Sequence, residues 1–217
     1  ENKDEKIKSK IKNSLHEVVG QKIESPKNKQ MKISAKEYFG FNEESTPKQT
    51  EIRATRITEP IKNTSIWGTL NSLLRQLIFE DLRGKLGGTY SPHVRLDKNL
   101  GHHAWSVSVG VKPELTKQAE EIIKNNILKI ALADKKDKDL KSRFEETQKM
   151  RLENILTLES SAGEIADFAI DDLANFEKIK NVNEGLRERL AVTFEDVCSL
   201  AKKELLPEKL FWFIEEP

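Results

Sequence analysis

The feature that most constrains this fold is a strictly alternating run in "HHAWSVSVGVKP", residues 102–113. Trp105, Val107, Val109 and Val111 are large and apolar, and the residues between them are small or polar. Successive side chains of a β-strand point to opposite faces of the sheet, so one face of this strand is expected to be buried and the other to face solvent. A sheet with one buried face needs a second layer of structure to cover that face.

Helical patterns supply the second layer. Apolar residues recur every three or four positions in residues 65–83 and again in residues 114–132. Each pattern predicts an amphipathic helix with one buried stripe, and Gly84 or Gly87 is predicted to end the first helix. Further helices are predicted over 134–158, 160–176, 181–192 and 193–206, the last with Thr193 as its N-cap.

Three more strands complete the predicted sheet. "TEIRATRIT" (50–58) is rich in β-branched residues, and "TYSPHVRLD" (89–97) forms a hairpin with the alternating run. "KLFWFIEEP" (209–217) is expected to return to the sheet, because "LFWFI" is too apolar to lie in water. The order of elements predicts an α+β fold, an antiparallel-rich sheet of roughly four to six strands with helices packed on one face.

Composition divides the chain and excludes several partners. Residues 1–48 are lysine-rich and are predicted to be a basic, partly helical linker or tail of a preceding domain, whereas 49–217 form the α+β domain. The net charge is only +1, so neither nucleic acid nor an anionic membrane surface is an expected partner. No apolar run is long enough to span a bilayer. Because the chain begins at Glu1 rather than Met, we expect either a processed protein or a fragment of a longer one. Its compartment, bacterial periplasm or cytoplasm, stays open.

The sequence contains no complete catalytic centre. None of His16, His93, His102 and His103 stands with a second histidine and a glutamate at the spacing of a helical zinc-protease site. A G-x-S-x-G nucleophile elbow and a phosphate-binding glycine loop are also absent. The single Cys198 lies in a predicted helix without an activating partner. This chain alone is therefore expected to contribute no metal ligand and no catalytic residue.

The stretch "LRGKLGGTYSP" (82–92) is the strongest candidate for a binding feature. Arg83 and Tyr90 flank Gly87 and Gly88 where a predicted helix gives way to a strand. Glycine permits a sharp turn and a close backbone approach. A guanidinium and a phenol can both donate hydrogen bonds to a peptide carbonyl or a developing oxyanion. The same residues also suit an ordinary helix end with an exposed arginine and an interfacial tyrosine, and the spacing alone leaves both interpretations open.

"LIFEDLRGKLGGTYSPHV" (77–94) closely resembles a signature in the C-terminal half of the pitrilysin/insulinase family of zinc peptidases. In that family an apolar helix ends in Leu-Arg, a glycine-containing turn follows, and Tyr-Ser comes next. Arg83 and Tyr90 match that arrangement, seven residues apart. The closing residues 193–217 are similar to the family's last helix and strand. The resemblance covers about residues 50–217, and "LGGTYSP" is more similar to the bacterial members than to the mitochondrial ones.

The resemblance implies a function in peptide cleavage. Members of the family are built from repeated α+β domains arranged as a clamshell. One domain holds zinc through an inverted His-x-x-Glu-His motif and a distal glutamate. A domain of the opposite half supplies an Arg/Tyr pair that binds the substrate and helps stabilise the tetrahedral intermediate. This chain carries the pair and lacks the zinc motif.

The resemblance therefore implies the substrate-binding domain of a zinc endopeptidase, inactive alone. Arg83, Tyr90, Gly87 and Gly88 would bind the peptide, and zinc would lie in a partner domain of the same or another chain. The alternative is a non-catalytic scaffold or peptide-binding subunit, like the degenerate family members that assemble without proteolysis.

Overall fold

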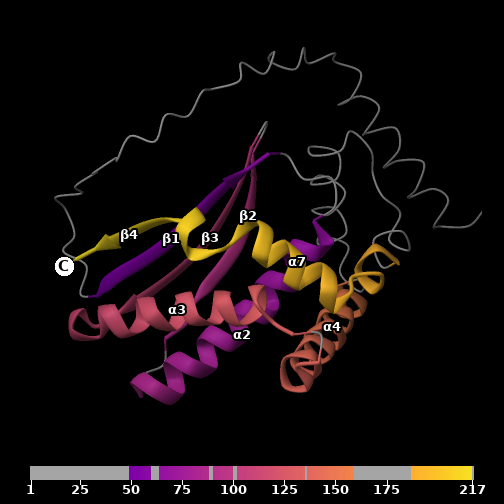
Figure 1. The fold of residues 1–217 in the computed structure, drawn as a ribbon, viewed down its shortest axis with the longest axis horizontal. Coiled ribbons are helices and arrows are strands. Elements are labelled where there is room, and N and C mark those ends of the chain that lie inside the picture. Colours follow the sequence, from indigo (N-terminus) through magenta and orange to yellow (C-terminus); the bar gives the residue numbers. More distant parts are fainter. Residues whose placement is uncertain are drawn as a thin grey trace, which may run out of the picture. The chain divides into compact units, whose positions relative to one another are not determined.

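The computed structural model describes residues 49–59, 64–87, 90–99, 102–134, 136–158 and 187–216. The chain divides into two compact units, Glu1–Glu37 and Tyr38–Pro217, and every described residue belongs to the second. Residues 1–48 and the helix predicted over 160–176 lie outside the described residues. The elements labelled in Figure 1, with two short 3₁₀ turns, are β1 (Thr50–Thr58), α2 (Ser65–Leu86), β2 (His93–Asn99), β3 (His102–Val111), η1 (Pro113–Leu115), α3 (Thr116–Ala131), α4 (Lys138–Leu158), α7 (Phe194–Glu204), η2 (Pro207–Lys209) and β4 (Phe211–Glu215).

The described strands form one antiparallel sheet in the order β2-β3-β1-β4. β2 and β3 are the predicted hairpin, with Val94 opposite Val107. β1 pairs with β3 on one side and with β4 on the other, so that Ala54 lies opposite both Val107 and Trp212. The predicted α+β fold is confirmed, and the four described strands match the lower limit of the predicted number.

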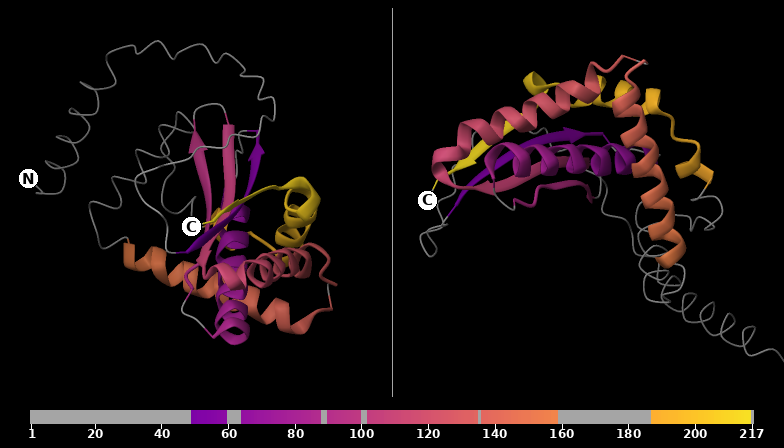
Figure 2. Two further views of the ribbon diagram at one scale, coloured as in Figure 1. Left: turned by 90° about the vertical axis from the view of Figure 1, so that its left-hand side faces the viewer. Right: turned by 90° about the horizontal axis from the view of Figure 1, so that it is seen from below.

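One face of the sheet forms part of the hydrophobic core. Trp105, Val107, Val109 and Val111 are each no more than 2% exposed, which confirms the predicted alternation. Helices α2, α3 and α7 cover this face (Figure 2). Burial of each large aliphatic side chain is worth about 1.5–3 kcal/mol, so this contact between layers supplies most of the stabilisation. The helical side of the core includes Leu70, Leu73, Leu74, Ile78, Ile123, Ile127, Ile130 and Val197.

Local sequence signals determine where two helices begin and end. Gly87, rather than Gly84, ends α2, and its φ of 68° is left-handed. The Gly87 N–H donates to the Arg83 carbonyl oxygen at 3.2 Å. α7 begins after Thr193 as predicted, with a capping box. Thr193 Oγ1 accepts from the Asp196 N–H at 3.1 Å, and the Asp196 carboxylate accepts from the Thr193 N–H at 3.0 Å.

The final strand differs in part from its prediction. β4 does return to the sheet, where it pairs with β1. Phe211, Phe213 and Ile214 nevertheless stay 47%, 46% and 45% exposed. Among the described strands β4 lies at an edge, and Phe211 and Phe213 alternate with the better-covered Trp212. Trp212 Nε1 donates to the Pro207 carbonyl oxygen at 3.2 Å, so the expected withdrawal from water holds chiefly for this residue.

Candidate functional site

The candidate site is the connection from α2 to β2. The buried stripe of α2 ends at Leu82, and Arg83 is the next residue, exposed on the last turn. Lys85 also lies in this turn and pairs with Asp81 at 3.1 Å. Two basic residues at a helix C-terminus interact favourably with the helix dipole. Arg83 can therefore stabilise the end of α2 even without a ligand.

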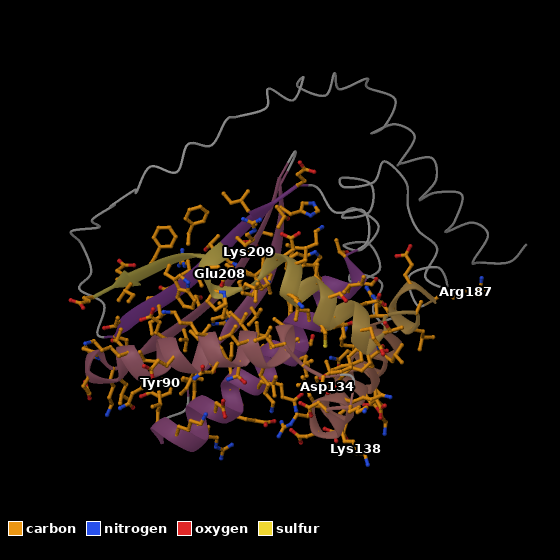
Figure 3. All side chains as sticks on the ribbon, viewed as in Figure 1. Tyr90, Asp134, Lys138, Arg187, Glu208 and Lys209 are labelled. Atoms are coloured by element: carbon orange, nitrogen blue, oxygen red, sulfur yellow. The ribbon has the colours of Figure 1, made fainter. Side chains whose placement is uncertain are left out.

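Tyr90 lies on the other side of the turn and is only 8% exposed. Its side chain belongs to the hydrophobic core, whereas the following Ser91 is exposed. In Figure 3 Tyr90 lies at one end of the helical layer, and Asp134 and Lys138, at the connection from α3 to α4, lie at the other. A ring packed in a core has little rotational freedom, so the position of its hydroxyl is set by the fold.

Gly87 is the residue whose backbone requires glycine. Its positive φ is costly for any residue with a Cβ, although a Cβ built there would meet no atom within 4 Å. The turn therefore uses glycine for conformation, and the space beside it is open to an approaching group. Gly88, predicted to bind the substrate with Gly87, lies outside the described residues.

The structure places Arg83 and Tyr90 at one connection but does not join them. Among the described residues no hydrogen bond or ring contact links the two side chains.

The position of β2 is a feature of the site that the sequence pattern alone did not provide. Among the described strands β2 lies at an edge of the sheet, and it begins three residues after Tyr90. An edge strand offers backbone N–H and C=O groups that can pair with an extended peptide.

The described residues do not fit a bound metal. No three His, Cys, Asp or Glu side chains gather in them at a distance suited to one ion. Cys198, for which the sequence predicts no activating partner, has its pKa raised to about 11, first by burial and then by Glu195 and Asp137. Its thiol is therefore protonated at neutral pH and is a weak nucleophile. None of the helices in the described part of the chain has the length and apolarity needed to cross a membrane.

No protein-family model and no curated protein matches the sequence. Solved structures do match the fold. The periplasmic protease PqqL from Escherichia coli is 15% identical, with a TM-score of 0.61 over 80% of this chain and 20% of PqqL. The inactive peptidase domain of a predicted zinc protease from Bordetella parapertussis is 9% identical, with a TM-score of 0.60 over 78% of this chain and 91% of that one. A chain of complex III2 from Candida albicans is 6% identical, with a TM-score of 0.62 over 79% of this chain and 43% of that one.

The chain has the fold of a zinc-protease domain. Because the sequence identities are only 6–15%, the similarity shows a shared fold and nothing more. The chain spans about a fifth of PqqL but nearly all of the Bordetella domain, so one copy of the zinc-protease fold accounts for the described residues. The similarity does not identify the half of a protease to which this domain corresponds, and it assigns no role to Arg83 or Tyr90.

Proposed function

We propose that this chain is the substrate-binding domain of a zinc-dependent endopeptidase and that it carries no zinc itself. The observation that carries the proposal is the α2–β2 connection, where Arg83 and Tyr90 flank a left-handed Gly87. The fold likeness to a protease and to an inactive peptidase domain supports it.

In this proposal the substrate is an extended peptide. It would lie along β2, the edge of the described sheet, and would pass the open space beside Gly87. Arg83, exposed and long, would reach a carbonyl of the peptide. Tyr90 would present its hydroxyl from a ring held by the core, so that little ordering is needed when the peptide binds.

The chemical contribution of the two residues would be hydrogen-bond donation. When a nucleophile attacks a peptide carbonyl, the oxygen gains negative charge, and fixed donors stabilise that charge. Loss of one such donor raises the activation barrier by about 3 kcal/mol. The zinc-activated step would belong to the partner domain, so this chain alone would not cleave peptides.

The first test is reconstitution. The 217-residue chain is assayed with an unfolded peptide and zinc, alone and then mixed with the zinc-bearing half from the same organism. We expect that neither part cleaves the peptide alone and that the mixture does. Chelator-sensitive cleavage by this chain alone would contradict the proposal.

The second test assigns the residues in the reconstituted enzyme. Arg83→Ala and Tyr90→Phe are each expected to lower kcat/KM by about 100-fold, equivalent to roughly 3 kcal/mol. Arg75→Ala is a matched control, because Arg75 is also an exposed arginine on α2 but lies two turns before the connection. Turnover unchanged in Arg83→Ala and Tyr90→Phe, with melting temperatures also unchanged, would remove the proposed role.

The alternative function is a scaffold subunit of a larger assembly. The fold likeness to a chain of complex III2 favours it, since that chain belongs to a multi-subunit complex. A scaffold would form a stable complex with the partner half and yet produce no cleavage, and Tyr90→Phe would leave complex formation unchanged. Size-exclusion chromatography of the mixture, run beside the peptidase assay, separates the two functions.

A further inference from the structure

The last strand, β4, carries an apolar run at an edge of the sheet. Among the described strands β4 lies beside β1 at one edge, and β2 forms the other edge (Figure 1). An edge strand presents unpaired backbone N–H and C=O groups, and proteins usually protect it with charged residues or proline. β4 instead has four consecutive large apolar residues, Phe211 to Ile214, and its one charged residue is the last, Glu215. Phe211, Phe213 and Ile214 are nearly half exposed, so this edge is suited to pairing with a further strand.

The sequence of this edge is complementary to itself. "KLFWFIE" (209–215) has matching residue classes at equal distances on either side of Trp212. Moving outward from Trp212, these are two phenylalanines, two aliphatic residues, and a cation facing an anion: Phe211 and Phe213, Leu210 and Ile214, and Lys209 and Glu215. When two identical strands pair antiparallel about a two-fold axis, residues at equal distances from the axis lie opposite each other. A second copy of the same strand is therefore the partner that this order of residues fits.

The same order selects one register. With the two-fold axis at Trp212, each Phe211 lies opposite Phe213 of the second copy, and aromatic pairs directly opposite each other stabilise a sheet. A shift of two residues in either direction would put Glu215 or Lys209 opposite a phenylalanine. The centred register is therefore the one in which apolar residues meet apolar residues along the whole strand.

The charges at the ends of the run have no ionic partner in their own copy. The pairing with β1 places Glu215 directly opposite Glu51, and like charges in that position destabilise a sheet. Glu51 accepts from Arg53 at 2.7 Å, whereas among the described residues no cation lies within ion-pairing distance of Glu215. Lys209 Nζ donates to the neutral Lys203 carbonyl oxygen at 2.6 Å, and no described carboxylate pairs with it. Each charge is therefore available to the opposite charge of a second copy.

β4 is held in its extended form without a partner strand. Its residues pair with β1 along their length. At its centre Trp212 Nε1 donates to the Pro207 carbonyl oxygen at 3.2 Å, and the Lys124 ammonium lies 4.9 Å from the centre of the indole ring. Because the strand is already ordered, little conformational entropy is lost when another strand pairs with it.

We propose that β4 is a self-association surface through which two copies of this chain form a two-fold symmetric dimer. The two β4 strands would pair antiparallel about Trp212 and join the sheets of the two copies into one. Phe211 and Phe213 of one copy would cover Phe213 and Phe211 of the other, and two Lys209–Glu215 ion pairs would form at the ends. The interface leaves β2 and the α2–β2 connection free, so it does not depend on the proposed peptidase function.

The first test is sedimentation velocity of the 217-residue chain at concentrations from roughly 1 µM to 1 mM. One added strand per copy is a small interface, so we expect a reversible dimer with a dissociation constant above about 1 µM. A chain that stays monomeric at the highest concentration would overturn the proposal. So would growth beyond the dimer, because a two-fold contact uses both β4 edges and closes the assembly.

The second test assigns the dimer to β4. Phe213→Thr keeps a β-branched residue in the strand and removes an exposed ring, so it should weaken the dimer at least about tenfold. Leu132→Thr is the matched control, because Leu132 is also an exposed apolar residue, 63% exposed, but follows α3. Circular dichroism checks that both variants stay folded. Equal dimer strength in the two variants would contradict a β4 interface.

The third test is a charge exchange that only the centred register predicts. Glu215→Lys alone, or Lys209→Glu alone, would place like charges opposite each other at both ends of the interface and should weaken the dimer by about tenfold. The double variant Lys209→Glu/Glu215→Lys restores opposite charges and should recover the wild-type dissociation constant to within about twofold. A double variant no stronger than the single variants would overturn the proposed pairing of the two strands.

Discussion

Arg143 and Arg151 lie two turns apart on α4 and face the same helix, yet their surroundings are opposite. Arg143 pairs with Glu80 and with Asp139, and the hydrogen bond that Arg143 donates to the Glu80 carboxylate is the main reason that its pKa is raised. Arg151 has Ser72 and a second arginine nearby, and its pKa is lowered. Whether the charge of an arginine on α4 is neutralised therefore depends on the residue that faces it from α2. That residue is the acidic Glu80 opposite Arg143 and the neutral Ser72 opposite Arg151, two turns away.

The two contacts should also differ in how much they stabilise the fold. The Arg143–Glu80 pair is partly open to water, with side chains 29% and 43% exposed, so solvent and salt screen it. The hydrogen bond from Arg151 to Ser72 is partly buried, and a cation that loses its acceptor there is not readily hydrated. A neutral hydroxyl is therefore expected to matter more to stability than a carboxylate.

The largest expected effect comes from Ser72→Ala. It removes the acceptor of the Arg151 guanidinium and should lower the free energy of unfolding by about 1–2 kcal/mol. Urea denaturation measures this value. A loss smaller than that of Glu80→Gln would reverse the expected ranking of the Arg151–Ser72 and Arg143–Glu80 contacts.

A second prediction concerns Gly68 on α2, where an added Cβ would lie 2.5 Å from Arg151 Nη2. Gly68→Ala should gain about 1 kcal/mol of helix propensity and lose about as much by displacing the guanidinium, so its net effect should be near zero. In an Arg151→Gln background the same substitution should stabilise the protein by about 1 kcal/mol.

Gly84→Ala provides the matched control for this double-mutant cycle of Gly68→Ala and Arg151→Gln. Gly84 also lies within α2, but a Cβ built there meets no atom within 4 Å. Its gain of about 1 kcal/mol should therefore be the same in both backgrounds. Equal behaviour of Gly68→Ala and Gly84→Ala would mean that Gly68 is not needed to seat Arg151.

A smaller effect is expected from Glu80→Gln, in the exposed pair with Arg143. Its cost should be a few tenths of a kcal/mol and should shrink further in 1 M salt, because an exposed ion pair is screened. Denaturation at two salt concentrations measures both quantities. A cost above about 1 kcal/mol that does not depend on salt would show that the Arg143–Glu80 pair is effectively buried.

The last prediction is a dependence of stability on alkaline pH. Because burial on folding lowers the pKa of Arg151 from its ordinary value to about 10, the folded state binds fewer protons than the unfolded state above about pH 10. The unfolding free energy of the wild type should then rise relative to Arg151→Gln as pH increases from about 10. Urea denaturation of both proteins at pH 9 and 11 tests the sign, and a falling difference would contradict it.

Much of the fold could be predicted from local patterns. The alternation around Trp105 predicted which face of that strand is buried, and Thr193, predicted as an N-cap, marked the start of α7. At the candidate site, the helix end near Gly87 was predicted because a positive φ is a local requirement of the backbone. The near-complete burial of Tyr90 was not, since it depends on the helices that pack around its ring.

The sequence by itself determined the elements, the buried faces and the turn that carries Arg83 and Tyr90, because these follow from side-chain periodicity and backbone preference within a few residues. Only the tertiary structure decided that β2 and β4 are the edges of the described sheet and that Arg151 meets Ser72, 79 residues away, above a glycine. A contact between distant helices leaves no periodic trace in either one. It exists because the packing of the core fixes the relative position of α2 and α4, and that position decides which polar group each arginine of α4 meets.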